Sequence, residues 1–343
     1  MVATAMMLGC APAPTTMNDP PVRAGLGISG GHSWLRLDAA ELDRQMAIVA
    51  GTGATWVRLD IDWALIEPVR GQKDWTATDR VVRAARAHAL SVLAILTYAP
   101  AWAGPHGGVG GSKASPHPVL FGEFAGAAVD HYGDQISHWE IWNEPNVTAF
   151  FAPAPDVGLY AHLLRQAALA VRARQPHGQV IVGGLAPSTN NGRDISPTSF
   201  VESLYALGAD ADFDGIAMHP YSYPELPDSP AWYNAFQNLT WIRRIMDERG
   251  DQAKLLWPTE FGAPTGTGAR AVSELRQAEI LERGLDMITE IHEVGPVFVY
   301  SLVDAGDDRD DLEDNFGVLR RDYTEKPAVT VLRARAEGLR VGR

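Results

Sequence analysis

Short apolar runs alternate with longer stretches of helical spacing along most of this chain. From residue 22 onward, runs that end in polar, Gly or Pro residues are each followed by a segment whose apolar positions lie three and four residues apart. The first pattern is typical of a buried strand and the second of an amphipathic helix. The sequence therefore predicts a regular β/α alternation.

The predicted strands share a continuous apolar character, which is expected when helices cover both faces of a parallel sheet. They are 22–28, 55–61, 91–97, 137–142, 179–184, 213–219, 254–260 and 296–302. The predicted helices are 39–50, 77–89, 120–132, 156–174, 198–207, 231–248, 274–292 and 326–338.

A (β/α)8 TIM barrel of the α/β class, formed by residues 22–343 as a single domain, is the fold that this order favours. The alternative is a doubly wound open sheet, which usually carries a Gly-rich phosphate-binding turn after its first strand. Here the first turn reads Gly-Ile-Ser-Gly-Gly-His (27–32), which lacks that spacing. The pattern therefore favours the closed barrel.

Composition narrows the class of protein. The chain has 343 residues, of which 46% are hydrophobic, so it can bury the core of a barrel domain. The formal net charge of −13 argues against a nucleic-acid partner, which would need a basic surface. Cys10 is the one cysteine, so the chain can form neither an internal disulfide nor a zinc cluster of several cysteines.

Residues 1–21 differ from the rest of the chain. An apolar stretch, 2–9, ends in Gly before Cys10, and a Pro-rich segment follows. This arrangement resembles the end of a bacterial lipoprotein signal with a flexible tether. We therefore expect an exported protein that is extracellular, periplasmic or lipid-anchored to the cell envelope at Cys10.

Two glutamates follow predicted strands directly. Glu144 lies in Ser-His-Trp-Glu-Ile-Trp-Asn-Glu-Pro-Asn (137–146), and Glu260 lies in Leu-Leu-Trp-Pro-Thr-Glu-Phe-Gly (255–262). The carboxyl ends of barrel strands are where active sites are built. Two carboxylates at one such rim are what cleavage of a glycosidic bond requires. For either glutamate alone, an ion pair with an arginine at the rim is the simpler interpretation.

The other strand ends are rich in polar and aromatic side chains, which suit a carbohydrate because apolar sugar faces stack on rings while hydroxyls form hydrogen bonds. The residues are His32, Arg58, Asp60, Asp62, Trp63, Tyr98, Trp102, Trp142, Asn143, His219, Tyr221, Tyr300 and Asp304.

Several of these side chains have a second interpretation. Trp63 and Trp102 are predicted to stack on sugar or to pack in the core, and His32 to face substrate or to bond within its loop. We expect only one of Asp60 and Asp62 to face the barrel axis, with the other pairing to a neighbouring helix.

The motifs resemble clan A of the glycoside hydrolases. The resemblance rests on Asn143-Glu144-Pro145, His219-Pro220-Tyr221 and Glu260, each at the expected strand, and it covers nearly all of residues 22–340. Within the clan, Trp-Glu-Ile-Trp-Asn-Glu-Pro-Asn (139–146) is similar to the family 39 group of β-xylosidases and exopolysaccharide endoglycosidases, and to cellulase-like family 5 enzymes.

The resemblance implies a role for each matching residue. Glu144 would be the general acid and then the base, and Glu260 the nucleophile of a retaining mechanism. Asn143 would bind the sugar 2-hydroxyl. Tyr221 and Arg58 would hold Glu260 ionised.

The same resemblance bears on two further positions. His219 would lie near the acid/base or a substrate hydroxyl. Many clan members place a Trp platform near the end of the eighth strand, where this chain has Phe298 or Tyr300. Neither a cofactor nor a metal is implied.

The sequence thus predicts a retaining β-glycosidase acting on an extracellular or cell-envelope polysaccharide or oligosaccharide. Long predicted loops, 98–118, 220–230 and 304–325, favour a groove open to polymers and endo action. The alternative is a carbohydrate-binding TIM barrel without catalysis. A barrel aldolase or metal-dependent hydrolase would need a strand-end Lys or a His pair, which the predicted tips lack.

An acidic run at 304–314 is dense enough to raise the question of calcium. It lacks the register and the Gly of an EF-hand, so a solvated acidic loop is the favoured interpretation.

Overall fold

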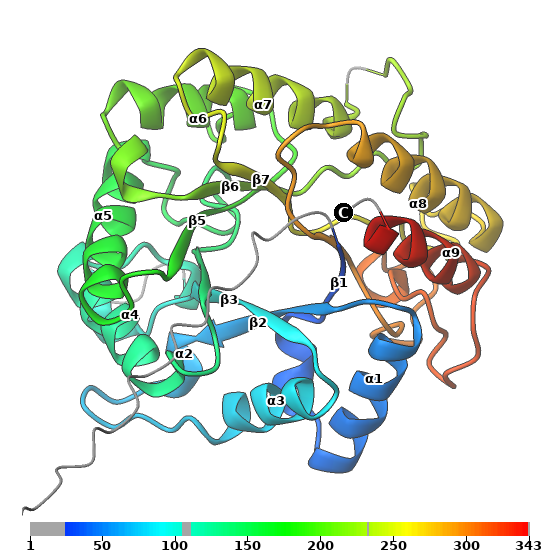
Figure 1. The fold of residues 1–343 in the computed structure, drawn as a ribbon, viewed down its shortest axis with the longest axis horizontal. Helices are drawn as coiled ribbons and strands as arrows, with labels where there is room; N and C mark the ends of the chain where they lie inside the picture. Colours follow the sequence, from blue (N-terminus) through cyan, green and yellow to red (C-terminus); the bar gives the residue numbers. More distant parts are fainter. Residues whose placement is uncertain (1–24, 105–110, 232, 342–343) are drawn as a thin grey trace, which may run out of the picture.

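The strands of the chain form one parallel barrel. The computed structural model describes residues 25–104, 111–231 and 233–341. Its eight strands are hydrogen-bonded in the order β7-β6-β5-β4-β3-β2-β1-β8, and they lie at the centre of a ring of helices (Figure 1). The strands are β1 (Leu26–Ser29), β2 (Trp56–Asp62), β3 (Ser91–Thr97), β4 (His138–Ile141), β5 (Gln179–Leu185), β6 (Gly215–Met218), β7 (Leu255–Pro258) and β8 (Val297–Val299). The predicted TIM barrel is confirmed.

The barrel closes between its last two strands through single bridges instead of a continuous ladder. Leu256 bridges Val294 and Phe261 bridges Val299, both in parallel. The Phe261 amide donates to the Phe298 carbonyl at 2.8 Å, and the Tyr300 amide donates to the Phe261 carbonyl at 3.0 Å. These bonds satisfy edge groups that an open sheet would expose.

The helices form the outer layer, and several begin at a capping side chain. Asp38, Asp156 and Ser273 each accept a hydrogen bond from a backbone amide three residues later, which satisfies a free donor of the first turn. The helices are α1 (Ala39–Gly51), α2 (Trp63–Ile66), α3 (Thr76–Ala87), α4 (Pro118–Tyr132), α5 (Val157–Arg174), α6 (Pro197–Ala206), α7 (Asn238–Glu248), α8 (Glu274–Thr289) and α9 (Ala328–Val341).

The largest departures from the predicted helices are one missed helix and one late start. The one-turn helix α2 was not predicted, and α7 begins at Asn238, not at residue 231. The Asn234 side chain explains the late start. Its amide donates to three preceding carbonyls while its oxygen accepts from the Phe236 amide, so these backbone groups bond locally instead of within a helix.

The lower interior of the barrel is filled by a small apolar cluster of inward-facing side chains. Its members are Leu93, Ile181, Ala217, Trp257 and Phe298, with Trp56 packed against them. A barrel interior packed in this way leaves room for a ligand only at its mouth.

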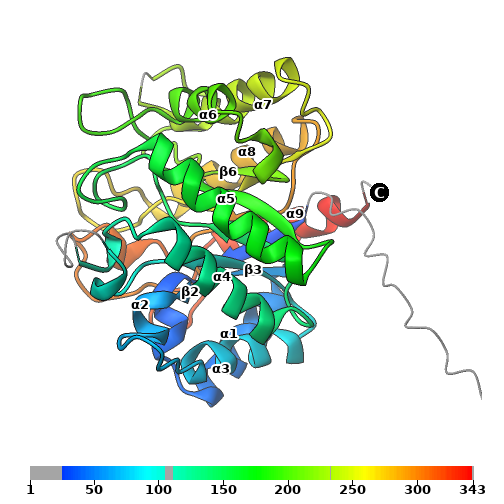
Figure 2. The same ribbon diagram turned by 90° about the vertical axis from the view of Figure 1, so that its left-hand side faces the viewer.

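The loops that follow the strands extend beyond the barrel on one side, to the left in Figure 2. Among the described residues, no helix combines the length and the apolar character that a membrane span needs. The leader 1–21 and Cys10 lie outside the described residues, so export and lipid anchoring stay predictions.

Candidate active site

Glu144 lies in a tight turn directly after β4. Trp142 and Glu144 adopt left-handed backbone conformations, with φ of 69° and 49°, which non-glycine residues adopt rarely. The Glu144 amide donates to the Gly184 carbonyl at 2.9 Å, so the turn is fastened to β5. The Glu144 side chain is 13% exposed at the barrel mouth.

Glu260 follows β7 and is held by two donors. Arg58 Nη1 donates to Glu260 Oε1 at 2.5 Å, and the Tyr221 hydroxyl donates to Oε2 at 2.8 Å. Burial raises the pKa of Glu260, but His219, Arg58 and Tyr221 together outweigh it and lower that pKa below its ordinary value. Glu260 is therefore held as a carboxylate, as a nucleophile requires.

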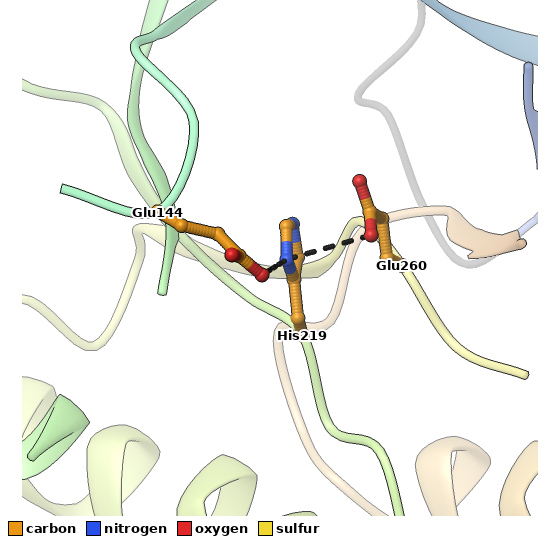
Figure 3. Close-up of side chains that lie close together, drawn as sticks. All are labelled: Glu144, His219 and Glu260. Atoms are coloured by element: carbon orange, nitrogen blue, oxygen red, sulfur yellow. Dashed lines mark hydrogen bonds and ion pairs between the residues drawn. The ribbon is translucent and has the colours of Figure 1, made fainter. Parts of the chain in front are cut away.

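His219 lies between the two glutamates (Figure 3). Its Nδ1 is 2.8 Å from Glu144 Oε1 and 3.6 Å from Glu260 Oε2. One ligand atom from each of the three residues lies within 4.8 Å of the others, so the two carboxylates converge. His219 is fully buried, and among the described residues its Nε2 has no hydrogen-bond partner.

Glu140, inside β4, supports the site and was not predicted from the sequence. Its carboxylate accepts two hydrogen bonds from Arg58, at 2.8 and 2.9 Å, and one from the Gly184 amide at 2.7 Å. Arg58 Nη2 also donates to Asn143 Oδ1 at 2.9 Å. The sequence does carry a signal for this role, because Glu140 is a charged residue inside the apolar run of β4. A fully buried carboxylate needs hydrogen-bonding partners, so such a residue indicates a polar network around it.

Arg58 thus links Glu140, Asn143 and Glu260. Burial alone lowers the pKa of Arg58, but the two glutamates raise it above its ordinary value, so it stays charged. Because one planar guanidinium orients all three side chains, the geometry of the site depends on it.

The expectation about Asp60 and Asp62 was wrong in its reasoning. Residues two apart on a strand share a face, so Arg58, Asp60 and Asp62 all lie on the same side of β2. Asp62 accepts from the Leu65 amide as the cap of α2 and lies 3.4 Å from His32 Nδ1. Hydrogen bonding to Asp62 raises the pKa of His32, which is partly exposed in the 3-10 helix Gly31–Arg36 after β1.

The tryptophans at the rim differ in what they offer a sugar. Trp63 is 1% exposed and stacks on Phe124 at 5.0 Å, so it packs in the helix layer and cannot serve as a platform. Trp102 is partly exposed and forms an edge-to-face pair with Trp63. The Arg70 guanidinium lies 5.4 Å from the centre of the Trp102 ring. The stacking role of Trp102 stays a prediction.

Tyr300 follows β8 and lies within the electrostatic reach of the site. Burial, together with the charges of Glu313 and Glu260, raises its pKa. Its hydroxyl donates to Glu313 Oε2 at 3.1 Å. A platform role for Tyr300 stays a prediction.

The acidic loop bonds largely within itself and to nearby cations. Asp304 pairs with Lys326 at 2.8 Å and Asp307 with Arg321 at 3.0 Å. Asp314 accepts from the Asp308 amide at 3.1 Å. Across the described ranges, the one group whose ligand atoms lie close enough to hold a metal ion is Glu144, His219 and Glu260.

One curated protein resembles part of this chain, and several solved structures resemble most of it. No profile of a known protein family matches the chain. A stretch of 116 residues is 26% identical to the β-glucosidase-like protein SFR2 of Oryza sativa subsp. japonica. This stretch covers 31% of this chain and 18% of that protein.

Solved structures resemble the whole barrel. A family 39 glycoside hydrolase from Bacteroides cellulosilyticus WH2 is 25% identical, with a TM-score of 0.75 over 93% of this chain and 64% of that one. A monomeric β-xylosidase from Caulobacter crescentus CB15 is 18% identical, with a TM-score of 0.70 over 91% of this chain and 69% of that one. A GH5_18 enzyme from Streptomyces cattleya, solved with GlcNAc, is 18% identical, with a TM-score of 0.69 over 94% and 82%.

The chain spans less than two thirds of the rice protein and of the Bacteroides enzyme. The structural neighbours include both families that the motifs of the sequence resemble, so they bear out that resemblance.

Proposed function

We propose that this protein is a retaining β-glycosidase that hydrolyses O-glycosidic bonds by double displacement. The observation that carries the proposal is the convergence of Glu144 and Glu260, whose nearest oxygens lie within 4.8 Å of each other. Retaining enzymes place their carboxyl groups about 5–5.5 Å apart, and inverting enzymes about 6.5–9.5 Å apart to admit a water molecule. The close approach of one oxygen from each carboxylate supports the retaining arrangement, which needs no room for a water molecule between them.

The environments of the two glutamates suit different roles. Glu260, held by Arg58 and Tyr221, has a lowered pKa and is the nucleophile. Glu144 lies at the barrel mouth in a hydrogen bond with the His219 imidazole, so it is placed to donate and later accept a proton. Asn143, oriented by Arg58, is placed to bind the 2-hydroxyl.

The β configuration is supported by the β-xylosidase and the β-glucosidase-like protein among the similar proteins. We further propose that the substrate is a polysaccharide or oligosaccharide of the cell envelope or the extracellular space. The long loops around the mouth support a polymer that enters from the side.

The stereochemistry of the product tests the mechanism. The protein is incubated with a panel of 4-nitrophenyl β-glycosides, and the anomer formed first is followed by proton NMR. We expect the β-anomer, because two inversions restore the starting configuration. An α-anomer as the first product would contradict the retaining mechanism.

The glutamine variant Glu260→Gln tests the nucleophile. It is expected to lose hydrolysis, because an amide cannot form the glycosyl ester. Glu279→Gln, a change on α8 in an exposed pair with Arg276, is the matched control and should keep the wild-type rate. If no glycoside or polysaccharide is cleaved but sugars bind, the protein is the carbohydrate-binding barrel instead.

A further inference from the structure

Asp60 is a buried carboxyl group without a protein partner at the barrel mouth. It lies on β2 on the same face as Arg58 and is 7% exposed. Among the residues that the structure describes, none donates a hydrogen bond to Asp60 or forms an ion pair with it. Other buried carboxylates of the chain do have a cation, as Asp212 has Arg165 at 3.0 Å and Asp304 has Lys326 at 2.8 Å.

The surroundings of Asp60 place it beside the catalytic groups. Burial raises the pKa of Asp60 to about 7, Arg58 opposes this, and the charges of Asp62 and Glu260 add to it. In turn, burial and the charge of Asp60 both raise the pKa of Tyr98. Asp60 therefore lies within electrostatic reach of Glu260 and Tyr98, on the side of the mouth formed by β2 and β3.

Tyr98 completes this corner of the site. It follows β3 and is partly buried, in an edge-to-face pair with Trp142 whose ring centroids lie 5.9 Å apart. The charges of Glu260 and Glu144 add to the rise in its pKa. Its hydroxyl has no hydrogen-bond partner among the described residues. Asp60 and Tyr98 thus offer an acceptor and a donor, both unused by the protein, next to the two catalytic carboxylates.

We infer that Asp60 determines specificity by binding a hydroxyl of the sugar ring held between Glu144 and Glu260; this inference rests on the proposed function. The Asp60 oxygens accept no hydrogen bond from the described protein residues and are not sealed from solvent, so a ligand hydroxyl in the mouth can reach them. A sugar hydroxyl both donates and accepts, so it can bond Asp60 and Tyr98 together. Both the acid and the carboxylate form of Asp60 can accept a hydrogen bond from a hydroxyl.

The test combines removal of the Asp60 side chain with removal of single hydroxyls from the substrate. The 4-nitrophenyl β-glycoside that the wild type cleaves best is compared with its monodeoxy analogues, using wild type and Asp60→Ala. On the parent substrate, Asp60→Ala is expected to lower kcat/KM roughly 10- to 100-fold, the value of one hydrogen bond to a charged or strongly polar group. On the analogue that lacks the bound hydroxyl, wild type and variant should have nearly equal kcat/KM.

Two variants separate binding from folding. Asp60→Asn keeps the shape and one acceptor, so it is expected to retain more activity than Asp60→Ala on the parent substrate. Asp212→Ala removes a similarly buried carboxylate on the outside of the barrel and should lower kcat/KM, if at all, by the same factor on every analogue. Thermal unfolding confirms that each variant is folded.

The outcomes are distinct. An equal loss for Asp60→Ala on every analogue would overturn the inference while the wild-type activity still supports a glycosidase. Equal kcat/KM of wild type and Asp60→Ala on the parent substrate would overturn it as well. Absence of any glycoside hydrolysis by the wild type would overturn the proposed function, and this inference with it.

Discussion

Arg58 orients several side chains at the barrel mouth and lowers the pKa of one of them, Glu260. Arg58 contacts Glu140, Asn143 and Glu260, and its charge favours the ionised form of Glu260. Asp60, on the same strand face, has no such bond and its pKa is raised by burial to about 7. The environments of these two carboxyl groups thereby shift their pKa values in opposite directions, which suits a nucleophile and a hydrogen-bonding group at one site.

The raised pKa of Asp60 predicts a pH-dependent cost in stability. Its ordinary pKa is 3.8, so between about pH 4 and 7 the unfolded chain loses this proton while the folded protein keeps it. The folded state then binds more protons, and this contribution to stability is lost as pH rises through that window. Asp60→Asn has no carboxyl group to ionise, so its stability does not fall in this way. The Tm of Asp60→Asn minus the Tm of the wild type should therefore be larger at pH 8 than at pH 5.

Thermal unfolding at the two pH values measures this difference. Asp212→Asn, which breaks the pair with Arg165, serves as the control and is expected to show no such gain at pH 8. A Tm difference between Asp60→Asn and wild type that does not change with pH would show that Asp60 ionises as freely in the folded protein as in the unfolded chain.

At the scale of elements, the end of β5 sets the position of the acid/base turn. Gly184 donates to Glu140 and accepts from the Glu144 amide, so it joins the buried support to the catalytic turn. A Cβ at Gly184 would lie 2.1 Å from His219 Nε2 and 2.7 Å from Thr259 Oγ1. Only glycine leaves room for the imidazole that contacts both glutamates.

Gly184→Ala is therefore expected to lower kcat strongly, because His219 has to move away from Glu144. The overpacked interior should also cost about 1–3 kcal/mol of unfolding free energy. Gly51→Ala, at the end of α1 where an added Cβ meets nothing within 4 Å, is the matched control. Initial rates and urea unfolding of both variants check this prediction; wild-type kcat in Gly184→Ala would refute it.

At the scale of the whole molecule, one buried lysine ties together the loops that follow the last two strands. Lys326 Nζ donates to Thr265 Oγ1 at 2.8 Å, Asp304 Oδ1 at 2.8 Å and the Gly317 carbonyl at 2.7 Å. All three ammonium hydrogens are used, so the cation is compensated although it is 1% exposed. This cluster fastens the C-terminal loops where the barrel closes only through single bridges.

Lys326→Met should destabilise the protein by about 3–5 kcal/mol, because it leaves Asp304 buried without its cation. Adding Asp304→Asn to Lys326→Met should restore part of that loss, since the uncompensated charge is then absent. Urea unfolding of both variants measures the two free energies. A double variant less stable than the single one would contradict this account.

The order of strands and helices and the tips that carry Glu144 and Glu260 were predictable from the sequence. Both depend on local patterns, since apolar periodicity reports which faces are buried and a parallel barrel brings every strand end to one rim. The late start of α7 was not predictable from such a pattern, because it depends on which carbonyls the Asn234 amide reaches.

Only the tertiary structure decided how the rim residues divide their roles. Burial separated Trp63, packed on Phe124, from the side chains that face the mouth. The bonds of Arg58 identified Glu140 as a support, and the absence of any such bond among the described residues set Asp60 apart. These distinctions arise from contacts between strands far apart in the chain, and periodicity along a single segment carries no information about them.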